Sequence, residues 1–176
     1  MSRVAVVGLG YVGLTLAVAL ARKGLTVLGY DREPRVVGAL QAGRPHLYEP
    51  GVADELRALL GGRLHVAAAL PPPPVDAAVL CAHAGLGGAL AALEPGGTLL
   101  VFSWLTDPAA LDFEQLLRRE LTLVGSCSAT PAAMRDAVAL LPELDPIPTV
   151  TLPLERFADG LELYRSHEAV KVVFTP

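Results

Sequence analysis

Cysteine, tryptophan and charge are all scarce in this sequence. Its two cysteines, Cys81 and Cys127, stand far apart, and with four scattered histidines they form no metal-ligand spacing, so no metal site is expected. No apolar run free of glycine, proline and charge is long enough to span a bilayer. The chain enters an apolar strand pattern almost at once, which leaves no room for a signal peptide. These absences predict a reduced, cytoplasmic protein.

What the chain has in abundance is apolar surface. Of its 176 residues, 52% are hydrophobic and only 18% are charged, with a formal net charge of −4. The acidic balance argues against a nucleic-acid partner. The length suffices for one domain with a substantial core, and the apolar composition suits a parallel sheet that helices cover on both faces.

Residues 2–31 carry the most informative pattern. The apolar run Val4–Val7 predicts a strand buried on both faces. A glycine-rich turn follows, then an apolar helix over 14–23 and a second strand over 25–30, which ends on Asp31. This order of strand, glycine turn, helix, strand and acid is the one that a dinucleotide site requires.

Each glycine of the turn has an expected role. Gly8 permits the tight turn, Gly10 lets the backbone approach a pyrophosphate, and Gly13 lets the helix lie close to the strand. The pyrophosphate would sit on the helix N-terminus, and Asp31 would accept hydrogen bonds from the adenosine ribose hydroxyls. The residues expected to bind the cofactor here are Gly8, Leu9, Gly10, Tyr11, Val12, Gly13, Asp31 and Arg32.

The pattern has two alternative interpretations besides a dinucleotide site. One is a parallel-sheet turn with incidental glycines, and the other is an S-adenosylmethionine site. The third glycine and the long first helix favour the dinucleotide. Asp31 should repel a 2′-phosphate, so NAD is expected rather than NADP, although the neighbouring guanidinium of Arg32 could pair with that phosphate.

Residues 2–66 resemble the NAD-binding part of the UDP-glucose and UDP-mannosamine dehydrogenase family. The segments that carry the resemblance are VAVVGLGYVGLTLAVALARKG, LGYD, LYEPGV and GRLHV. Short helices are expected over 34–42 and 52–60, and a third strand over 64–66. The likeness stops at Ala67–Ala69, where the family usually has Thr-Asp. The family's catalytic cysteine, lysine and asparagine motifs and its sugar-binding domain have no counterpart in the sequence.

Four consecutive prolines, Pro71–Pro74, separate the two halves of the chain. A sheet of order 3-2-1-4 must cross here over about 20–25 Å, and an extended segment from Val66 to Val75 reaches about 28 Å. Residues 67–74 are therefore interpreted as an extended crossover, with a linker between two domains as the alternative.

Residues 75–176 resemble the C-terminal half of the medium-chain dehydrogenase/reductase superfamily, which includes zinc alcohol and sorbitol dehydrogenases. Segments such as VDAAVLCAHAG, LEPGGTLLVFS, PLERFADGLELYRS and AVKVVFTP carry the resemblance. Strands are expected over 75–81, 98–103, 121–125, 149–152 and 170–174, and helices over 84–93, 112–119, 130–141 and 154–166. Residues 94–97 are expected to form the turn into the strand over 98–103, and Asp112 to cap the helix over 112–119. The resemblance implies that the domain with the zinc ligands and the proton relay is missing.

The two resemblances together indicate a natural or engineered hybrid of two dehydrogenase families. The expected fold is one doubly wound α/β Rossmann domain with a parallel six-stranded sheet of order 3-2-1-4-5-6 and helices on both faces. Its first half would span 1–66, its second half 75–148, and a strand-helix-strand extension 149–176.

Beyond the glycine turn, a second group of candidates follows the fourth and fifth strands. By the resemblance, Ala82, His83 and Phe102 would line the cofactor. Cys81 and His83 could form a nucleophile and base, but no orienting acid is evident. Tyr48-Glu49 could bring a carboxylate near the cofactor, or simply pack as a loop. The Trp104 loop would either cover the nicotinamide ring or plug a bare face.

The predicted function is NAD(H) binding without efficient turnover, in a domain of dehydrogenase ancestry. The expected partners are a second copy, joined through the edge strand 121–125, or a separate substrate-binding chain. Two alternatives stay open: a small NAD-dependent dehydrogenase of nucleotide sugars or alcohols that uses Cys81, His83 or Glu49, and a nucleotide-sensing regulatory protein.

Overall fold

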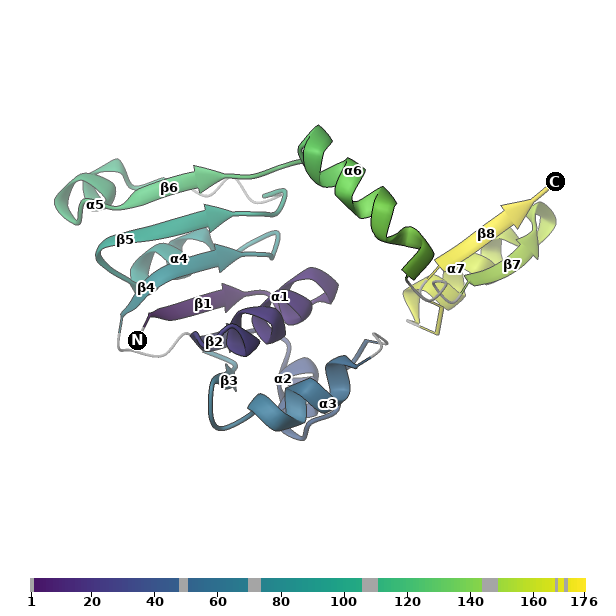
Figure 1. The fold of residues 1–176 in the computed structure, drawn as a ribbon, viewed down its shortest axis with the longest axis horizontal. Coiled ribbons are helices and arrows are strands. Elements are labelled where there is room, and N and C mark those ends of the chain that lie inside the picture. Colours follow the sequence, from purple (N-terminus) through teal and green to yellow (C-terminus); the bar gives the residue numbers. More distant parts are fainter. Residues whose placement is uncertain are drawn as a thin grey trace. The chain divides into compact units, whose positions relative to one another are not determined.

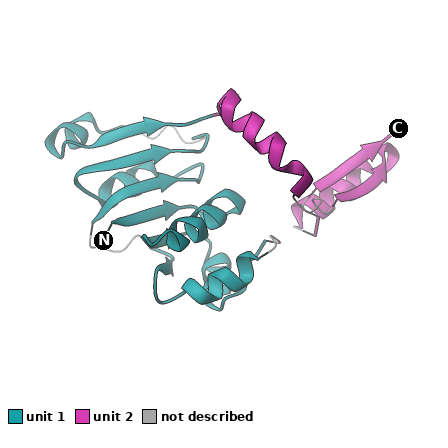
Figure 2. Ribbon diagram, viewed as in Figure 1, with its two compact units in different colours: residues 1–127 teal, residues 128–176 magenta. Residues whose placement is uncertain are grey.

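The computed structural model describes residues 2–47, 51–69, 74–105, 111–143, 149–166, 168–169 and 171–176. They form two compact units, residues 1–127 and 128–176, which Figure 2 shows in different colours. The first unit contains the predicted sheet. The helix that follows its sixth strand groups with the C-terminal strands in the second unit.

The first unit is built on a six-stranded sheet of order β3-β2-β1-β4-β5-β6, whose neighbouring strands all pair in parallel. This confirms the predicted order. Figure 1 shows β1, β4, β5 and β6 side by side, with their carboxyl ends at the same edge. The strands are β1 (Arg3–Val7), β2 (Thr26–Tyr30), β3 (Leu64–Ala67), β4 (Val75–Leu80), β5 (Leu93–Val101) and β6 (Thr122–Gly125).

Helices cover both faces of this sheet. The apolar side chains of β1 point alternately to the two faces and so contribute to two cores. Val6 lies in one buried cluster, and Ala5 and Val7 lie in the other. The first cluster takes side chains from α1 (Tyr11–Arg22), α2 (Pro34–Gln41) and α3 (Val52–Leu59), and the second from α4 (Leu86–Ala92) and α5 (Phe113–Arg118). A strand buried on both sides requires the continuous apolar run seen in the sequence.

Several element ends differ from the expected ones. Helix α1 begins at Tyr11, directly after Gly10, rather than at residue 14. Helix α4 begins after Gly85, whose φ of 102° is left-handed, rather than at residue 84. The expected turn over 94–97 is a bulge inside β5, because Leu93 pairs with Val75 before Thr98 pairs with Ala77. The predicted N-cap of α5 is confirmed, since Asp112 accepts the N–H of Gln115 at 3.1 Å.

Strand β6 is the least covered element of the sheet. Leu123 and Val124 keep 40% and 42% of their surface exposed, and all of its residues are exposed. It pairs with β5 on one side only within the described part of the chain. Helix α5, which precedes it, buries none of its residues. An apolar, unpaired edge of this kind favours association.

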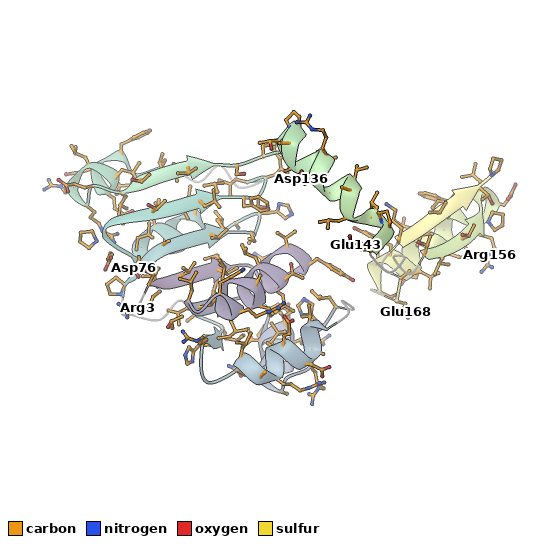
Figure 3. All side chains as sticks on the ribbon, in the orientation of Figure 1. Arg3, Asp76, Asp136, Glu143, Arg156 and Glu168 are labelled. Carbon is orange, nitrogen blue, oxygen red and sulfur yellow. The ribbon has the colours of Figure 1, made fainter. Side chains whose placement is uncertain are left out.

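At the amino ends of the strands, the acidic pair Asp76 and Glu94 connects β1, β4 and β5. The backbone N–H of Arg3 donates to Asp76 at 2.5 Å, and this bond is the main reason that the pKa of Asp76 lies below its usual value. A hydrogen bond with Asp76 and its charge raise the pKa of Glu94. Figure 3 shows Arg3 and Asp76 beside each other. This cluster lies away from the carboxyl ends, where α/β sheets bind ligands.

The second unit is small and has little core of its own. It contains α6 (Pro131–Leu140), β7 (Thr149–Pro153), α7 (Phe157–Arg165) and β8 (Lys171–Thr175), with short 3-10 turns at Leu141–Glu143 and Leu154–Arg156. The C-terminal strands pair with each other in parallel. Helix α7 packs closely on β8 at Gly160, where a Cβ would lie 2.5 Å from the Phe174 ring.

Candidate functional site

A cavity of about 710 Å³ opens at the carboxyl ends of β1, β2 and β4. This is where the strand order reverses around β1, the place at which doubly wound sheets bind their ligands. Six of the sequence-predicted residues line it: Gly8, Gly10, Asp31, Arg32, Ala82 and His83. The structure therefore brings the glycine turn, the acid after β2 and the residues after β4 into one site.

Each of the three turn glycines meets a different physical demand. Gly8 has a φ of 92°, and a Cβ there would lie 2.7 Å from the Cβ of Ala82. A Cβ on Gly13 would lie only 1.8 Å from the carbonyl oxygen of Gly8, so helix and turn could not approach as they do. Gly10 is the exception, because nothing lies within 4 Å of its Cβ position. Its open side is available to a ligand.

The N-terminus of α1 provides the anion-binding element of the cavity. The helix has 12 residues, its N-cap is Gly10, and its described first turn holds no acidic side chain. The first intrahelical bond runs from the Leu14 N–H to the Gly10 carbonyl at 2.9 Å. The N–H groups before Leu14 lack intrahelical acceptors by geometry, and the helix dipole makes this end positive. A pyrophosphate fits these groups.

Asp31 does more than line the cavity. Its Oδ2 accepts the backbone N–H of Leu9 at 2.8 Å, and its Oδ1 accepts the N–H of Glu33 at 2.9 Å. The carboxylate therefore ties the glycine turn to the end of β2. Each carboxylate oxygen can accept two hydrogen bonds, so both retain capacity for a ligand hydroxyl.

The other predicted residues of the turn occupy different environments. The side chain of Leu9 is fully buried in the core. Tyr11 and Val12 are exposed at the start of α1. The backbone of Leu9, but not its side chain, is therefore close to the site, and its N–H already donates a hydrogen bond to Asp31.

Cys81 and His83 lie in the same cavity but have different surroundings. Cys81 is half-buried, and burial raises the pKa of its thiol, which keeps it protonated and poorly nucleophilic. The Nδ1 atom of His83 lies 2.7 Å from the carbonyl oxygen of Trp104 and 3.4 Å from the Ser103 hydroxyl. The structure therefore supports no thiolate–imidazole pair, and it links His83 to the loop after β5.

A second cavity of about 310 Å³ lies at the carboxyl ends of β5 and β6. Phe102, the remaining predicted cofactor residue, lines this cavity rather than the first. Trp104 also lines it, with 77% of its surface exposed. Cys127 also lines this cavity and is exposed. Sequence reasoning did not single out Ser103 and Ser126, although Ser126 directly follows β6 and Ser103 lies two residues after the end of β5, which is the available signal.

Some residues singled out from the sequence lie outside the part of the chain that the structure describes. Tyr48 and Glu49 belong to the part of the chain that the structure does not describe, as do Pro71–Pro73. Within the described ranges, no group of three or more histidine, cysteine, aspartate or glutamate residues is placed to hold a metal ion. None of the described helices is long and apolar enough to cross a bilayer.

Comparison with known proteins finds similar proteins for the first part of the chain. Residues 2–83 match the NAD-binding domain of the UDP-glucose/GDP-mannose dehydrogenase family. The UDP-N-acetyl-D-mannosamine dehydrogenase of Pyrococcus horikoshii is 40% identical over 65 residues, which cover 36% of this chain and 16% of that protein. The predicted resemblance of the N-terminal segment is thereby confirmed.

Two solved structures extend the likeness over the whole chain. A UDP-glucose dehydrogenase from Pyrobaculum islandicum has a TM-score of 0.53 at 28% identity, and covers 100% of this chain and 46% of that one. A cobalt- and zinc-bound alcohol dehydrogenase from Pyrobaculum aerophilum has a TM-score of 0.63 at 21% identity, with 99% and 50% covered. The second likeness shows the fold alone. The chain spans about half the length of these structures, and its first part matches an NAD-binding domain.

Proposed function

We propose that this chain binds NAD(H) across the carboxyl ends of β2, β1 and β4 and supplies the cofactor half of an oxidoreductase. The observation that carries the proposal is that Gly10, the N-cap of α1, lines the cavity and has no atom within 4 Å of its Cβ position. That position is where a pyrophosphate needs close backbone approach. When bound, NAD(H) supplies hydride transfer, while the chain's own residues bind and orient it.

The sheet order sets the direction in which the dinucleotide lies. Asp31 and Arg32 follow β2, on one side of the glycine turn, and His83 follows β4, on the other. With the pyrophosphate at Gly10, the adenosine ribose falls to Asp31 and the second nucleoside to His83. The cavity of Phe102 and Trp104 follows next in strand order and has no charged residue in its described lining. An uncharged nicotinamide ring suits that lining.

Asp31 is expected to make the site prefer NADH to NADPH by about tenfold or more, because a carboxylate beside a 2′-phosphate is a like-charge contact. Calorimetric titration of the two cofactors measures the preference. Arg32→Ala is the matched variant, and it should weaken NADPH binding without affecting NADH. Equal or tighter binding of NADPH by the unmodified chain would contradict the assignment of Asp31.

The 176-residue chain is expected to bind NADH without efficient turnover. Hydride transfer needs a substrate held about 3–3.5 Å from the reacting carbon and a proton acceptor in reach. The cavity is open, and the Cys81 thiol is held in its protonated form. Residues of another domain or chain would supply the substrate wall. A robust rate with UDP-sugars or simple alcohols, abolished by His83→Ala, would instead support a small dehydrogenase.

We further propose that the chain forms a homodimer through the free edge of β6. Leu123 and Val124 leave this edge apolar, and such edges pair with a second copy. Val124→Lys is expected to shift the protein to monomer, whereas Val138→Lys, at an exposed position of α6, should not. Light scattering at working concentration measures the state. A monomeric wild-type protein would refute the proposal.

A further inference from the structure

The hydrogen bond between His83 and Trp104 fixes how the imidazole presents itself to a ligand. A backbone carbonyl oxygen only accepts hydrogen bonds, so the 2.7 Å contact from Nδ1 requires that Nδ1 carry the proton. In the neutral ring, Nε2 then holds the lone pair. The same contact explains the longer 3.4 Å distance to the Ser103 hydroxyl. Because Nδ1 carries the proton and donates, it cannot also accept a hydrogen bond from the Ser103 hydroxyl.

The position of His83 decides which ligand group meets that lone pair. His83 lines the cavity with Gly8 and Gly10, and it follows β4, on the opposite side of β1 from Asp31. Nδ1 is occupied by the Trp104 carbonyl, so Nε2 is the ring atom left to bind a ligand. An acceptor there selects a donor. Phosphate oxygens of a bound dinucleotide do not donate, but ribose hydroxyls do.

We propose that His83 is the residue by which this site recognises the second ribose of a dinucleotide, with Nε2 accepting a ribose hydroxyl while Nδ1–H holds the Trp104 carbonyl. The inference rests on the proposed NAD(H) function and names Nε2 of His83 as the atom that contacts the second ribose. His83 thus binds the cofactor directly and discriminates a dinucleotide from a mononucleotide. It also couples the two cavities, since Trp104 lines the second one.

Two substitutions separate the two nitrogen atoms. In His83→Asn, the side-chain amide can still donate to the Trp104 carbonyl from near the Nδ1 position, but it cannot reach the place of Nε2. In His83→Gln, an amide oxygen reaches the place of Nε2 as an acceptor, but the donor at Nδ1 is lost. Trp104 is the single tryptophan of the chain, so its fluorescence reports the loop without interference.

The experiment titrates ADP, ADP-ribose and NADH into the wild-type protein and both variants by calorimetry. His83→Asn is expected to bind ADP-ribose and NADH about three- to tenfold more weakly, the size of one neutral hydrogen bond. It should bind ADP unchanged and keep the wild-type Trp104 emission. His83→Gln should retain most of the affinity and alter that emission.

The outcomes distinguish this inference from the proposed function. Unchanged binding of NADH and ADP-ribose by His83→Asn, or an equal loss for ADP, overturns the role of His83 and leaves NAD(H) binding intact. Wild-type protein that binds neither ADP nor NADH overturns both. Normal ADP binding by a variant shows at the same time that its site is folded.

Discussion

Replacing Gly10 with alanine is expected to leave the fold intact and to weaken NADH binding by about a hundredfold. No atom lies within 4 Å of the Cβ position, so the methyl group costs the folded protein little. The bound pyrophosphate would collide with it and lose a charged hydrogen bond to the backbone, worth about 3 kcal/mol. Calorimetry measures the affinity, and circular dichroism checks the fold.

Gly38→Ala is the matched control for this substitution. Gly38 lies inside α2, and its Cβ position is equally open. Alanine there should leave NADH binding unchanged and raise stability by about 1 kcal/mol, as for glycine in a helix interior. If Gly10→Ala and Gly38→Ala bound NADH equally well, the pyrophosphate would not lie at the glycine turn.

Gly13→Ala is expected to have the largest effect on stability, with a loss of about 3 kcal/mol or more. Its Cβ would lie 1.8 Å from the Gly8 carbonyl oxygen, and neither partner is a flexible side chain. The helix or the turn must move, which is the costly form of overpacking. The fluorescence of Trp104 reports the unfolding of the first unit in urea, because Gly13 and Trp104 both lie in that unit.

Gly10→Ala is the comparison for that measurement, because it adds the same methyl group three residues earlier. Its urea midpoint should match the wild type, while the midpoint of Gly13→Ala should fall well below it. Equal midpoints for both variants would show that α1 can shift away from the turn, contrary to the close packing described for Gly13.

The sequence was sufficient for features that depend on neighbours along the chain. The apolar run of β1 demanded burial on both faces, which fixes a parallel sheet with helices on each side. The glycine turn and Asp31 predicted a cofactor site at the end of β1, and the NAD-binding family match confirms the cofactor. Asp112 predicted the start of α5 because capping is local.

Other features depend on contacts that no local pattern encodes. The bond from His83 to Trp104 joins residues 21 positions apart, and the bond from the Leu9 N–H to Asp31 joins residues 22 apart. Cysteine is among the residue types that are most often buried, but Cys127 is exposed beside the uncovered β6. The roles of the individual cofactor residues remain predictions.

An amide NMR titration of the whole chain with NADH tests the central claim most directly. The account predicts that the largest shift changes follow the cavity at the ends of β1, β2 and β4, at Gly8, Gly10, Asp31 and His83. The amides of β7, α7 and β8 should change little. Shift changes confined to the second unit, or none at saturating NADH, would contradict the assignment of this cavity as the NAD(H) site.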